Sequence, residues 1–418
     1  MTMKRVCMIV TNPATNDSRV INEASSLYAN GYDVTVLAIK NNNTLSEEYI
    51  KGYTVKRLSR WIKSNSIFGK LEFTLKFTLM AIKQRADIFH AHDLSTLLEC
   101  YLAAKITHAK VIYDSHELYM DPIDHGFGHW LYSVLEKSLI KRVDNVITVN
   151  RYIAKFLENH YKLNRPVFVI MNCPSLKQDI YPTNPIKNSK CLDELRAEKR
   201  KNKKIIVYQG LIHAERCLKQ LVEAMNYLPE NYHLFIIGEG DFSQELENFA
   251  LSSGLTGKIS FTGPVSLDEL PTYTKLADIG ITLHNVGLSN YFSSPNKLFQ
   301  YIHAGIPIIA QNFPFLKEVI EGYEIGCLTN GVDTNRIDVA IKSALEDKVH
   351  HIKMKTFVSL IRFDVDPVRI ANAIKSALEN ESRYSRMKAN TMIAKERFNW
   401  EKESHVFLEV YRKTCAEN

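Results

Sequence analysis

Short apolar runs alternate with amphipathic segments along most of the chain, and this pattern predicts an α/β protein. The opening shows the repeating unit. An apolar run at residues 5–10 is followed by helical spacing of apolar residues from Ser18, a glycine at Gly31, and a second apolar run at 33–38. Runs of this kind, separated by helices, form parallel strands covered by helices on both faces. We therefore expect parallel-sheet domains.

The same alternation continues in two series. The first series of predicted strands spans residues 5–10, 33–38, 53–58, 86–90, 110–113, 145–149 and 167–171. The second spans 204–209, 232–237, 258–261, 278–283 and 306–310, with helices near 216–228, 242–252 and 267–275, and the chain is helical from 333 onward. Between the two series the segment 172–203 is polar, charged and contains proline, which is typical of a linker.

These patterns predict two facing Rossmann-like domains with an interdomain cleft. The boundaries are 1–175 for the first domain, 176–203 for the linker and 204–399 for the second domain. We expect the last helix, at about 400–418, to pack back on the first domain. The carboxyl ends of both parallel sheets should face the cleft, because open α/β sheets bind ligands there.

Composition excludes several classes of protein. Of the 418 residues 45% are hydrophobic, yet none of the apolar runs approaches the ~18–20 residues of a membrane span, and the chain begins without a signal-peptide pattern. The seven cysteines are scattered and form no CxxC pair, which favours reduced thiols in a cytoplasmic protein over a zinc site or disulfide framework. The net charge of +7 comes without a nucleic-acid motif, so we expect no nucleic-acid partner. Its densest basic run, 196–204, is either a solvated linker or a contact for an anionic membrane.

The segment 289–310 predicts a ligand site. Ser294 is a suitable N-cap and Pro295 a suitable first residue for a short helix, and Gly305 can take the left-handed conformation that ends it. The helix would then open at the carboxyl end of the strand at 278–283, where its free N–H groups favour an anion. Lys297 falls in the first turn, where a cation opposes the helix dipole. Either an anionic ligand compensates it, or its side chain points away into solvent.

Further polar residues follow other predicted strands. Gly210 ends the first strand of the second domain, and Arg216 opens the helix after it, where a guanidinium can contact a phosphate with two hydrogen bonds. Gly238 and Glu239 end the next strand, and the glycine permits close backbone approach. In the first domain His116 lies at a strand end.

His90 and His92 also end a strand in the first domain, and alternation along an extended chain would point both side chains the same way. Two histidines at this spacing can ligate a metal, but the sequence shows no third ligand. We therefore expect no metal there.

Together these motifs resemble the retaining group 4 glycosyltransferases with the GT-B fold, and in particular their Pro-Asn-Lys-Leu-Phe subgroup. The matching pieces are Asp17-Ser-Arg-Val, Gly31-Tyr-Asp-Val-Thr-Val, Ala86-Asp-Ile-Phe-His-Ala-His-Asp93, Val146-Ile-Thr-Val-Asn150, Tyr208-Gln-Gly210, Glu215-Arg216, Ile236-Ile-Gly-Glu-Gly240, Phe261-Thr-Gly263, Pro295-Asn-Lys-Leu-Phe-Gln-Tyr301 and Gly305-Ile-Pro307. Each is modest alone, but their order and spacing are specific and cover nearly the whole chain.

The resemblance implies roles for single residues. A nucleoside-diphosphate sugar would bind to the second domain through Gly210, Arg216, Gly238, Glu239, Ser294, Pro295, Asn296, Lys297 and Gln300. The catalytic residues implied are His116, which contacts the transferred sugar in this family, Arg216 and Lys297. On the acceptor side we expect Asp17, Arg19 and His92. Because protein cations would neutralise the diphosphate, we expect neither a metal nor another cofactor.

Three positions depart from the family pattern. Leu211 stands where the family has a second phosphate-binding arginine, and Phe292 and Gln300 stand where it usually has two glutamates. Gln300 can still hydrogen-bond ribose hydroxyls, whereas Phe292 accepts no hydrogen bond. The donor sugar can therefore differ from that of the family, or activity can be lost.

The function expected is transfer of a sugar, with retention, from a nucleoside-diphosphate sugar to a hydroxyl acceptor in surface polysaccharide or glycoconjugate assembly. The acceptor would be a carbohydrate or a lipid-linked molecule, and the enzyme cytoplasmic, with peripheral contact at the anionic inner face of the membrane. The apolar segment 68–83, which carries several lysines, suits such contact but is also the pattern of an ordinary amphipathic helix. Two alternatives stay open: a sugar-nucleotide epimerase of similar fold, and a non-catalytic binding subunit.

Overall fold

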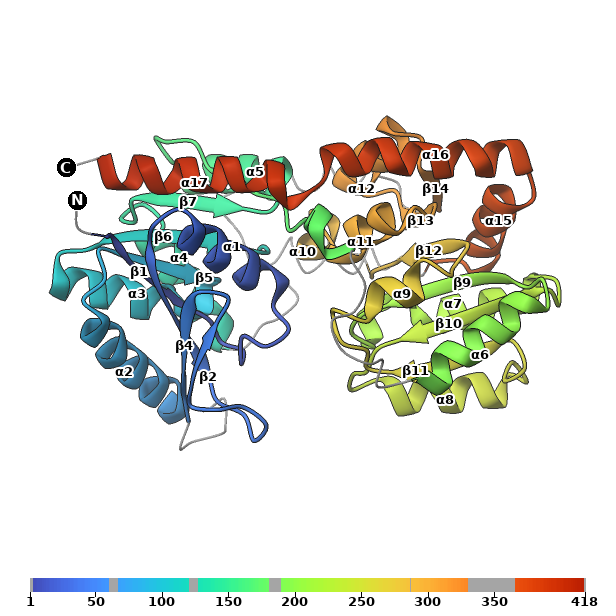
Figure 1. Ribbon diagram of the computed structural model, residues 1–418, viewed down its shortest axis with the longest axis horizontal. Coiled ribbons are helices and arrows are strands. Elements are labelled where there is room, and N and C mark those ends of the chain that lie inside the picture. The colour runs from blue at the N-terminus through green and yellow to red at the C-terminus, as the bar shows by residue number, and fades with distance from the viewer. Residues whose placement is uncertain are drawn as a thin grey trace. The chain divides into compact units, whose positions relative to one another are not determined.

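A computed structural model describes residues 3–59, 67–119, 127–179, 189–285, 287–329 and 365–416. The chain divides into two compact units, one made of residues 1–172 with 400–418 and the other of residues 173–399 (Figure 1). Each unit is built on one sheet with helices on both faces.

The sheet of the first unit has eight strands in the order β3-β4-β2-β1-β5-β6-β7-β8. Their bounds are β1 Arg5–Ile9, β2 Asp33–Ile39, β3 Glu47–Ile50, β4 Tyr53–Leu58, β5 Ile88–His92, β6 Lys110–Ser115, β7 Asn145–Thr148 and β8 Phe168–Val169. All neighbours pair in parallel except β3 and β4, which are antiparallel. The strand order reverses at β1, which lies between β2 and β5, so the ligand crevice of this sheet is expected at their carboxyl ends.

The helices of the first unit follow the strands and bury one apolar face each. They are α1 Ser18–Ala29, α2 Ile67–Gln84, α3 Leu94–Thr107, α4 Phe127–Leu139, α5 Arg151–Tyr161 and α17 Trp400–Ala416. The last of these comes from the end of the chain and packs against α1. Its Phe407 and Tyr411 are fully buried in one core with Val36 and Ile112 of the sheet. The C-terminal helix thus closes the core of the first unit.

The second unit contains a six-stranded parallel sheet in the order β11-β10-β9-β12-β13-β14. Its strands are β9 Lys204–Gln209, β10 Tyr232–Ile237, β11 Ile259–Gly263, β12 Ile279–Thr282, β13 Ile308–Gln311 and β14 Gly326–Thr329. Counted within the unit this is the order 3-2-1-4-5-6 of dinucleotide-binding folds. The order reverses between β9 and β12, so their carboxyl ends are where a ligand is expected.

The helices of the second unit are mostly short. They are α6 Ser189–Arg200, α7 Leu218–Ala224, α8 Ser243–Ser252, α9 Leu270–Thr274, α10 Leu288–Tyr291, α11 Asn296–Ala304, α12 Pro314–Gly322, α15 Pro367–Leu378 and α16 Glu381–Arg397. Single turns of 3-10 helix span Leu176–Asp179, Ala214–Arg216 and Met225–Tyr227. The apolar faces of α7, α8 and α15 share one buried core with β9 and β10.

The predicted two parallel-sheet domains are confirmed, with differences in detail. The segment predicted as a linker contains the helix α6, which is joined to the second unit by an ion pair between Lys199 and Asp278. Lysines of the basic run at 196–204 also form local ion pairs: Lys201 and Lys203 both pair with Glu198. Part of the helical region predicted from 333 onward, residues 333–364, lies outside the described residues. Among the described helices, none is long and apolar enough to cross a bilayer.

Candidate functional site

Two glycine turns at the carboxyl ends of β9 and β10 pack directly against each other. Gly210 and Gly238 have φ angles of +123° and +141°, which side-chain-bearing residues rarely adopt. A Cβ atom at Gly238 would lie 1.9 Å from the carbonyl oxygen of Gly210, so only glycine fits. The Gly210 N–H donates to Ile237 O at 2.9 Å and holds the turns together. The result is an open stretch of backbone at the point where the strand order reverses.

Lys297 lies beside these turns rather than in solvent. It is the second residue of α11, which begins at Asn296 with Pro295 as its N-cap, one residue later than predicted with Ser294 as the cap. The Lys297 side chain is 9% exposed, and its Nζ lies 3.7 Å from the centroid of the Tyr208 ring, at the end of β9. The interpretation in which this lysine points away from the helix end is therefore wrong.

Arg216 contributes a second cation to this place. It ends the 3-10 turn that follows β9 and is half-buried. Burial, and then the charge of Arg216, lower the pKa of Lys297 well below its usual range. Burial and the same two cations also lower the pKa of His284, which follows β12. Within the described part of the chain neither Arg216 nor Lys297 forms an ion pair with a carboxylate.

Two cations without carboxylate partners among the described residues, one of them in the first turn of α11, form an environment that favours an anion. The sequence predicted Arg216 and Lys297 for this role. It missed Tyr208 and His284, although both stand next to the quoted strand ends. The sequence does not show that the Tyr208 ring lies under the ammonium group of Lys297, because the two residues are far apart along the chain.

The other predicted donor-binding residues differ in how they are held. Gln300 on α11 accepts a hydrogen bond of 2.6 Å from Gln209 Nε2, so one end of its amide is already engaged. The Ser294 hydroxyl is buried and has no hydrogen bond within the described residues. The side chains of Glu239 and Asn296 are exposed. Phe292 is 9% exposed and packs edge-on against Tyr291. Of the predicted donor-binding residues, Gly210, Gly238, Arg216 and Lys297 are the ones that close contacts or electrostatic effects link to one another.

In the first unit the predicted residues Arg19 and His92 belong to a buried polar cluster. The Arg19 guanidinium forms two hydrogen bonds with Asp114, of 2.6 and 2.7 Å, and a third with Ile170 O at 2.8 Å. Arg19 is 2% exposed and His92 3% exposed. Their expected role as direct acceptor contacts is not supported, because both side chains are enclosed. Asp17 instead caps α1 by accepting from the N–H of Val20 at 3.2 Å.

His116 is the member of this cluster that reaches the surface, with 24% of its side chain exposed. Its ring is held between two carboxylates. Nε2 lies 3.0 Å from Asp114 Oδ2, and Nδ1 lies 3.2 Å from Asp93 Oδ2. Burial opposes protonation of the ring, but Asp93 and Asp114 outweigh it and raise the pKa of His116 well above its usual value. The site thus presents a partly exposed imidazole, favoured in its protonated form, just after the carboxyl end of β6.

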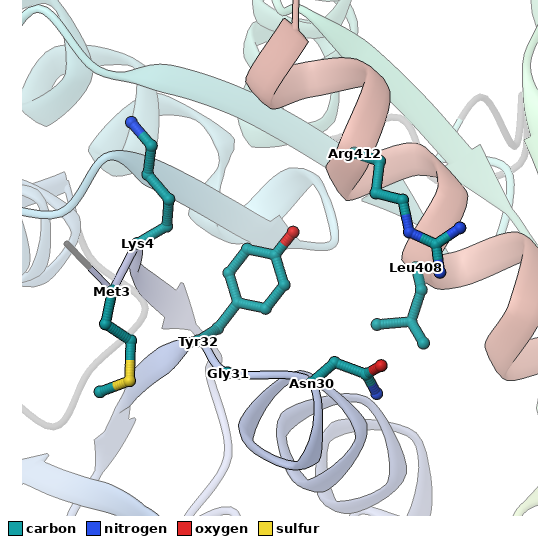
Figure 2. A pocket seen from close by; sticks show the side chains of 7 residues that line it. All are labelled: Met3, Lys4, Asn30, Gly31, Tyr32, Leu408 and Arg412. Carbon is teal, nitrogen blue, oxygen red and sulfur yellow. The ribbon is translucent and has the colours of Figure 1, made fainter. Parts of the chain in front are cut away.

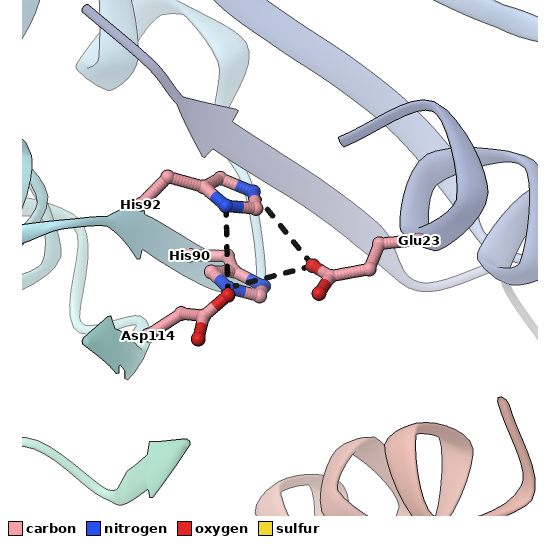
Figure 3. Close-up of side chains that lie close together, drawn as sticks. All are labelled: Glu23, His90, His92 and Asp114. Atoms are coloured by element: carbon pink, nitrogen blue, oxygen red, sulfur yellow. Dashed lines mark ion pairs between the residues drawn. The ribbon is translucent and has the colours of Figure 1, made fainter. Parts of the chain in front are cut away.

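His92 Nδ1 lies 3.4 Å from His116 Nε2, and His92 in turn is close to His90 and Glu23 (Figure 3). The rings of His90 and His92 are stacked with centroids 4.3 Å apart, as expected for residues two apart on one strand. Burial raises the pKa of Glu23 despite the nearby guanidinium of Arg19. Sequence analysis missed Glu23. Its spacing of four residues from Arg19 on one helix face was the available signal.

A pocket of about 350 Å³ opens in another part of the first unit (Figure 2). It lies between the start of β1, the end of α1 and α17. Its lining residues are Met3, Lys4, Asn30, Gly31, Tyr32, Leu408 and Arg412. None of the predicted site residues lines it, so we do not assign it to the reaction.

Comparison with known proteins defines the class. Residues 18–176 match the family model described as Glycosyltransferase Family 4, and residues 193–358 match Glycosyl transferases group 1. The fold is that of GT-B glycosyltransferases: the structure of the Anabaena protein HepE in complex with UDP and glucose superposes with a TM-score of 0.71 at 15% identity, covering 98% of this chain and 99% of that one. The chain belongs to the GT-B glycosyltransferases of the group 1/4 family.

Two curated relatives match parts of the chain. A GDP-mannose-dependent alpha-(1-6)-phosphatidylinositol monomannoside mannosyltransferase of Mycobacterium tuberculosis is 28% identical over 129 residues, which is 29% of this chain and 32% of that protein. The putative teichuronic acid biosynthesis glycosyltransferase TuaH of Bacillus subtilis is 23% identical over 269 residues, or 57% of this chain and 64% of TuaH. The matched part of the chain thus spans about a third of the length of the mannosyltransferase and somewhat under two thirds of the length of TuaH.

Proposed function

We propose that the protein transfers a sugar, with retention, from a nucleoside-diphosphate sugar to a hydroxyl acceptor. The observation that carries this proposal is the pair of cations Arg216 and Lys297, which lack carboxylate partners within the described residues. Lys297 stands in the first turn of α11, and the charge of Arg216 acts on it. They lie at the carboxyl end of β9, where the strand order of the second unit reverses. A diphosphate is the ligand that this charge arrangement suits.

In this proposal the protein cations stabilise the leaving diphosphate. Negative charge grows on the diphosphate as the bond to the sugar breaks, and fixed cations in a partly dry site stabilise that charge without reorganising. The positive end of the α11 dipole adds to the effect. A metal ion is not required for this step. The glycine backbone at Gly210 and Gly238 lets the donor approach closely, and Gln300 is placed to hydrogen-bond the ribose.

We propose that His116 acts on the transferred sugar from the first unit. It is partly exposed and positively charged, while Asp93 and Asp114 fix the orientation of its ring. Because both ring nitrogens face carboxylates, a hydrogen bond from the ring to a sugar hydroxyl would replace one of these contacts. Arg19 and His92 then serve as positioning residues that hold Asp114 and His116, rather than as acceptor contacts.

The acceptor and the cellular setting belong to the same proposal. The relatives named above include a phosphatidylinositol mannoside mannosyltransferase and a putative teichuronic acid glycosyltransferase, so we place this chain in surface polysaccharide or glycolipid assembly at the cytoplasmic face of the membrane. The helix α2 supports a peripheral contact. Phe68, Leu71, Leu75 and Leu79 follow helical spacing, and each side chain is more than half exposed. Lysines of the same helix would attract an anionic lipid surface.

A donor screen followed by product analysis tests the function. The full chain is heated with UDP-, GDP-, ADP- and CMP-sugars, since a ligand that binds only the folded state raises the melting temperature. The sugar nucleotide that does so is then incubated with lipid-linked and free sugar acceptors. Formation of an α-linked product from an α-linked donor supports retention. An epimer formed from the donor alone, or no stabilisation by any sugar nucleotide, would contradict the proposal.

A further inference from the structure

Four side chains in the interior of the first unit direct metal-ligating atoms toward one another (Figure 3). They are Glu23 of α1, His90 and His92 of β5, and Asp114 of β6, and each is at most 3% exposed. One ligand atom from each residue lies within 4.8 Å of the ligand atoms of the other three. Three separate elements of the fold therefore converge on one point.

Three of these residues have buried acceptor atoms without a hydrogen bond. Glu23 Oε2 lies 3.8 Å from both His90 Nε2 and His92 Nε2, which is too far for a hydrogen bond. A buried acceptor without a donor costs about 1–3 kcal/mol. A cation placed among the three atoms would satisfy all of them at once.

The neighbouring contacts orient the histidine rings for this role. His90 Nδ1 lies 2.6 Å from the buried hydroxyl of Tyr411, whereas its Nε2 has no acceptor within reach. The ring proton is therefore best placed on Nδ1, and the lone pair of Nε2 faces the cluster. His90 thus has on its second nitrogen the kind of partner that metal-binding histidines usually have. On the other ring, Nδ1 of His92 lies 3.4 Å from His116 Nε2 and 3.6 Å from Asp114 Oδ2, and its Nε2 has no hydrogen bond within the described residues.

The spacing and the charge both fit a divalent cation. Ligand atoms bound tetrahedrally at about 2.0–2.2 Å lie about 3.3–3.6 Å apart. The contacts of 3.7–3.8 Å that Glu23 and Asp114 make with the histidines are a few tenths of an ångström longer, and all four ligand atoms lie within 4.8 Å of one another, so the site would contract on binding an ion. Asp114 Oδ2, at 3.7 Å from His90 Nε2, completes the fourth position although it also accepts from Arg19. With His90 and His92 neutral and His116 protonated, the carboxylates of Glu23, Asp93 and Asp114 exceed the cations of Arg19 and His116 by one negative charge.

We propose that Glu23, His90, His92 and Asp114 bind one divalent transition-metal ion, with zinc the first candidate. Two imidazole nitrogens with two carboxylate oxygens are a ligand set of borderline softness, which suits zinc better than magnesium or calcium. The ion would tie α1 to β5 and β6 and would thereby fix Asp114 behind His116. It belongs to the first unit and plays no part in binding the diphosphate. Because the ligands are buried, the metal would enter as the protein folds.

Metal content tests the proposal. The full chain is expressed in zinc-supplemented medium, purified without a metal-affinity resin and measured by plasma mass spectrometry after gel filtration. We expect about one zinc per chain. The variant Glu23→Gln keeps the side-chain volume but removes the charged ligand, and we expect at least a tenfold lower zinc content. His92→Gln is the second variant, and His405→Gln, at an exposed histidine of α17, is the matched control that should keep the metal.

Cobalt provides an independent readout of the ligands. After unfolding with a chelator and refolding with Co²⁺, we expect the visible bands of a four-coordinate nitrogen and oxygen site, without the near-ultraviolet band of a thiolate ligand. A wild-type chain that binds neither zinc nor cobalt would overturn the proposal. So would a thiolate band, or full metal content in both Glu23→Gln and His92→Gln.

Discussion

The ammonium nitrogen of Lys297 lies 3.7 Å from the centre of the Tyr208 ring, although the two residues come from different elements of the second unit. Lys297 belongs to the first turn of α11, and its side chain extends to Tyr208 near the end of β9. A cation over an aromatic face is stabilised by about 0.5–2 kcal/mol. This stabilisation favours the charged form of Lys297, whereas burial and the charge of Arg216 lower its pKa. The lysine is thus fixed next to the backbone of Gly210 before any ligand arrives.

Arg216→Ala should weaken the binding of a nucleoside diphosphate far more than that of the corresponding nucleoside. A hydrogen bond to a charged group is worth about 1.5–3 kcal/mol, which corresponds to roughly 10- to 150-fold in affinity. Calorimetry with both ligands measures the difference. Lys219→Ala is the control, because this partly exposed lysine pairs with Glu245 at 2.7 Å. Equal losses for diphosphate and nucleoside would exclude a phosphate contact by Arg216.

Replacing Lys297 should stabilise the free protein and weaken donor binding. Burial lowers the pKa of Lys297 in the folded state, so the unfolded chain binds more protons, and the stability contributed by this residue falls as the pH falls below its unfolded pKa. Lys297→Met removes this penalty and should raise the melting temperature at neutral pH by about 2–4 °C. The gain over wild type should shrink toward pH 10. A variant that is less stable than wild type at pH 7 would contradict the assignment.

A bound diphosphate should also raise the pKa of Lys297 back toward its usual range, because a nearby anion favours the charged form of an amine. Calorimetry of nucleotide binding in two buffers of different ionisation enthalpy should then show proton uptake by the wild type. Lys297→Met is the control, in which any remaining uptake arises elsewhere. Identical proton uptake in the two proteins would argue that Lys297 does not meet the phosphates.

His116→Ala should reduce turnover more than donor affinity. The imidazole lies in the first unit, whereas the residues proposed to bind the diphosphate lie in the second, and loss of a single electrostatic contact to the reacting group costs roughly 10²-fold in kcat. Steady-state kinetics with saturating donor, together with the dissociation constant of the donor, separate the two effects. His405→Ala serves as the comparison. Unchanged kcat would remove His116 from the proposed machinery.

The exposed apolar residues of α2 should govern membrane binding. Replacing Leu71 and Leu75 by Ser removes apolar surface without changing charge, and cosedimentation with vesicles that contain anionic lipid should drop several-fold. Leu251→Ser, at a comparably exposed leucine of the second unit, should have little effect. If the α2 double variant binds anionic vesicles as well as wild type, the contact lies elsewhere or is absent.

Most strands could be predicted from sequence because buried parallel strands are continuous apolar runs. The strands that were missed lack this signal. β3 reads Glu-Glu-Tyr-Ile and is half exposed along one edge, and β14 begins with a glycine. The start of α11 was displaced by one residue because Ser294 and Pro295 are both acceptable at a helix start.

The candidate site was only partly accessible from sequence. Spacing and resemblance indicate which residues belong to it, but side-chain directions depend on tertiary neighbours. Arg19 was expected at the acceptor, yet Asp114 and the carbonyl of Ile170 enclose its guanidinium. For the same reason Glu23 could not be joined to His90 and His92, since they meet only when α1 packs on β5.

A crystal structure of the full chain with the nucleoside diphosphate of its donor tests the central claim most directly. We predict that the phosphate oxygens lie within about 3.2 Å of Lys297 Nζ, of the Arg216 guanidinium and of the backbone N–H groups that open α11. Phosphates bound at another place, with Lys297 still over Tyr208 and no ligand near it, would contradict the account.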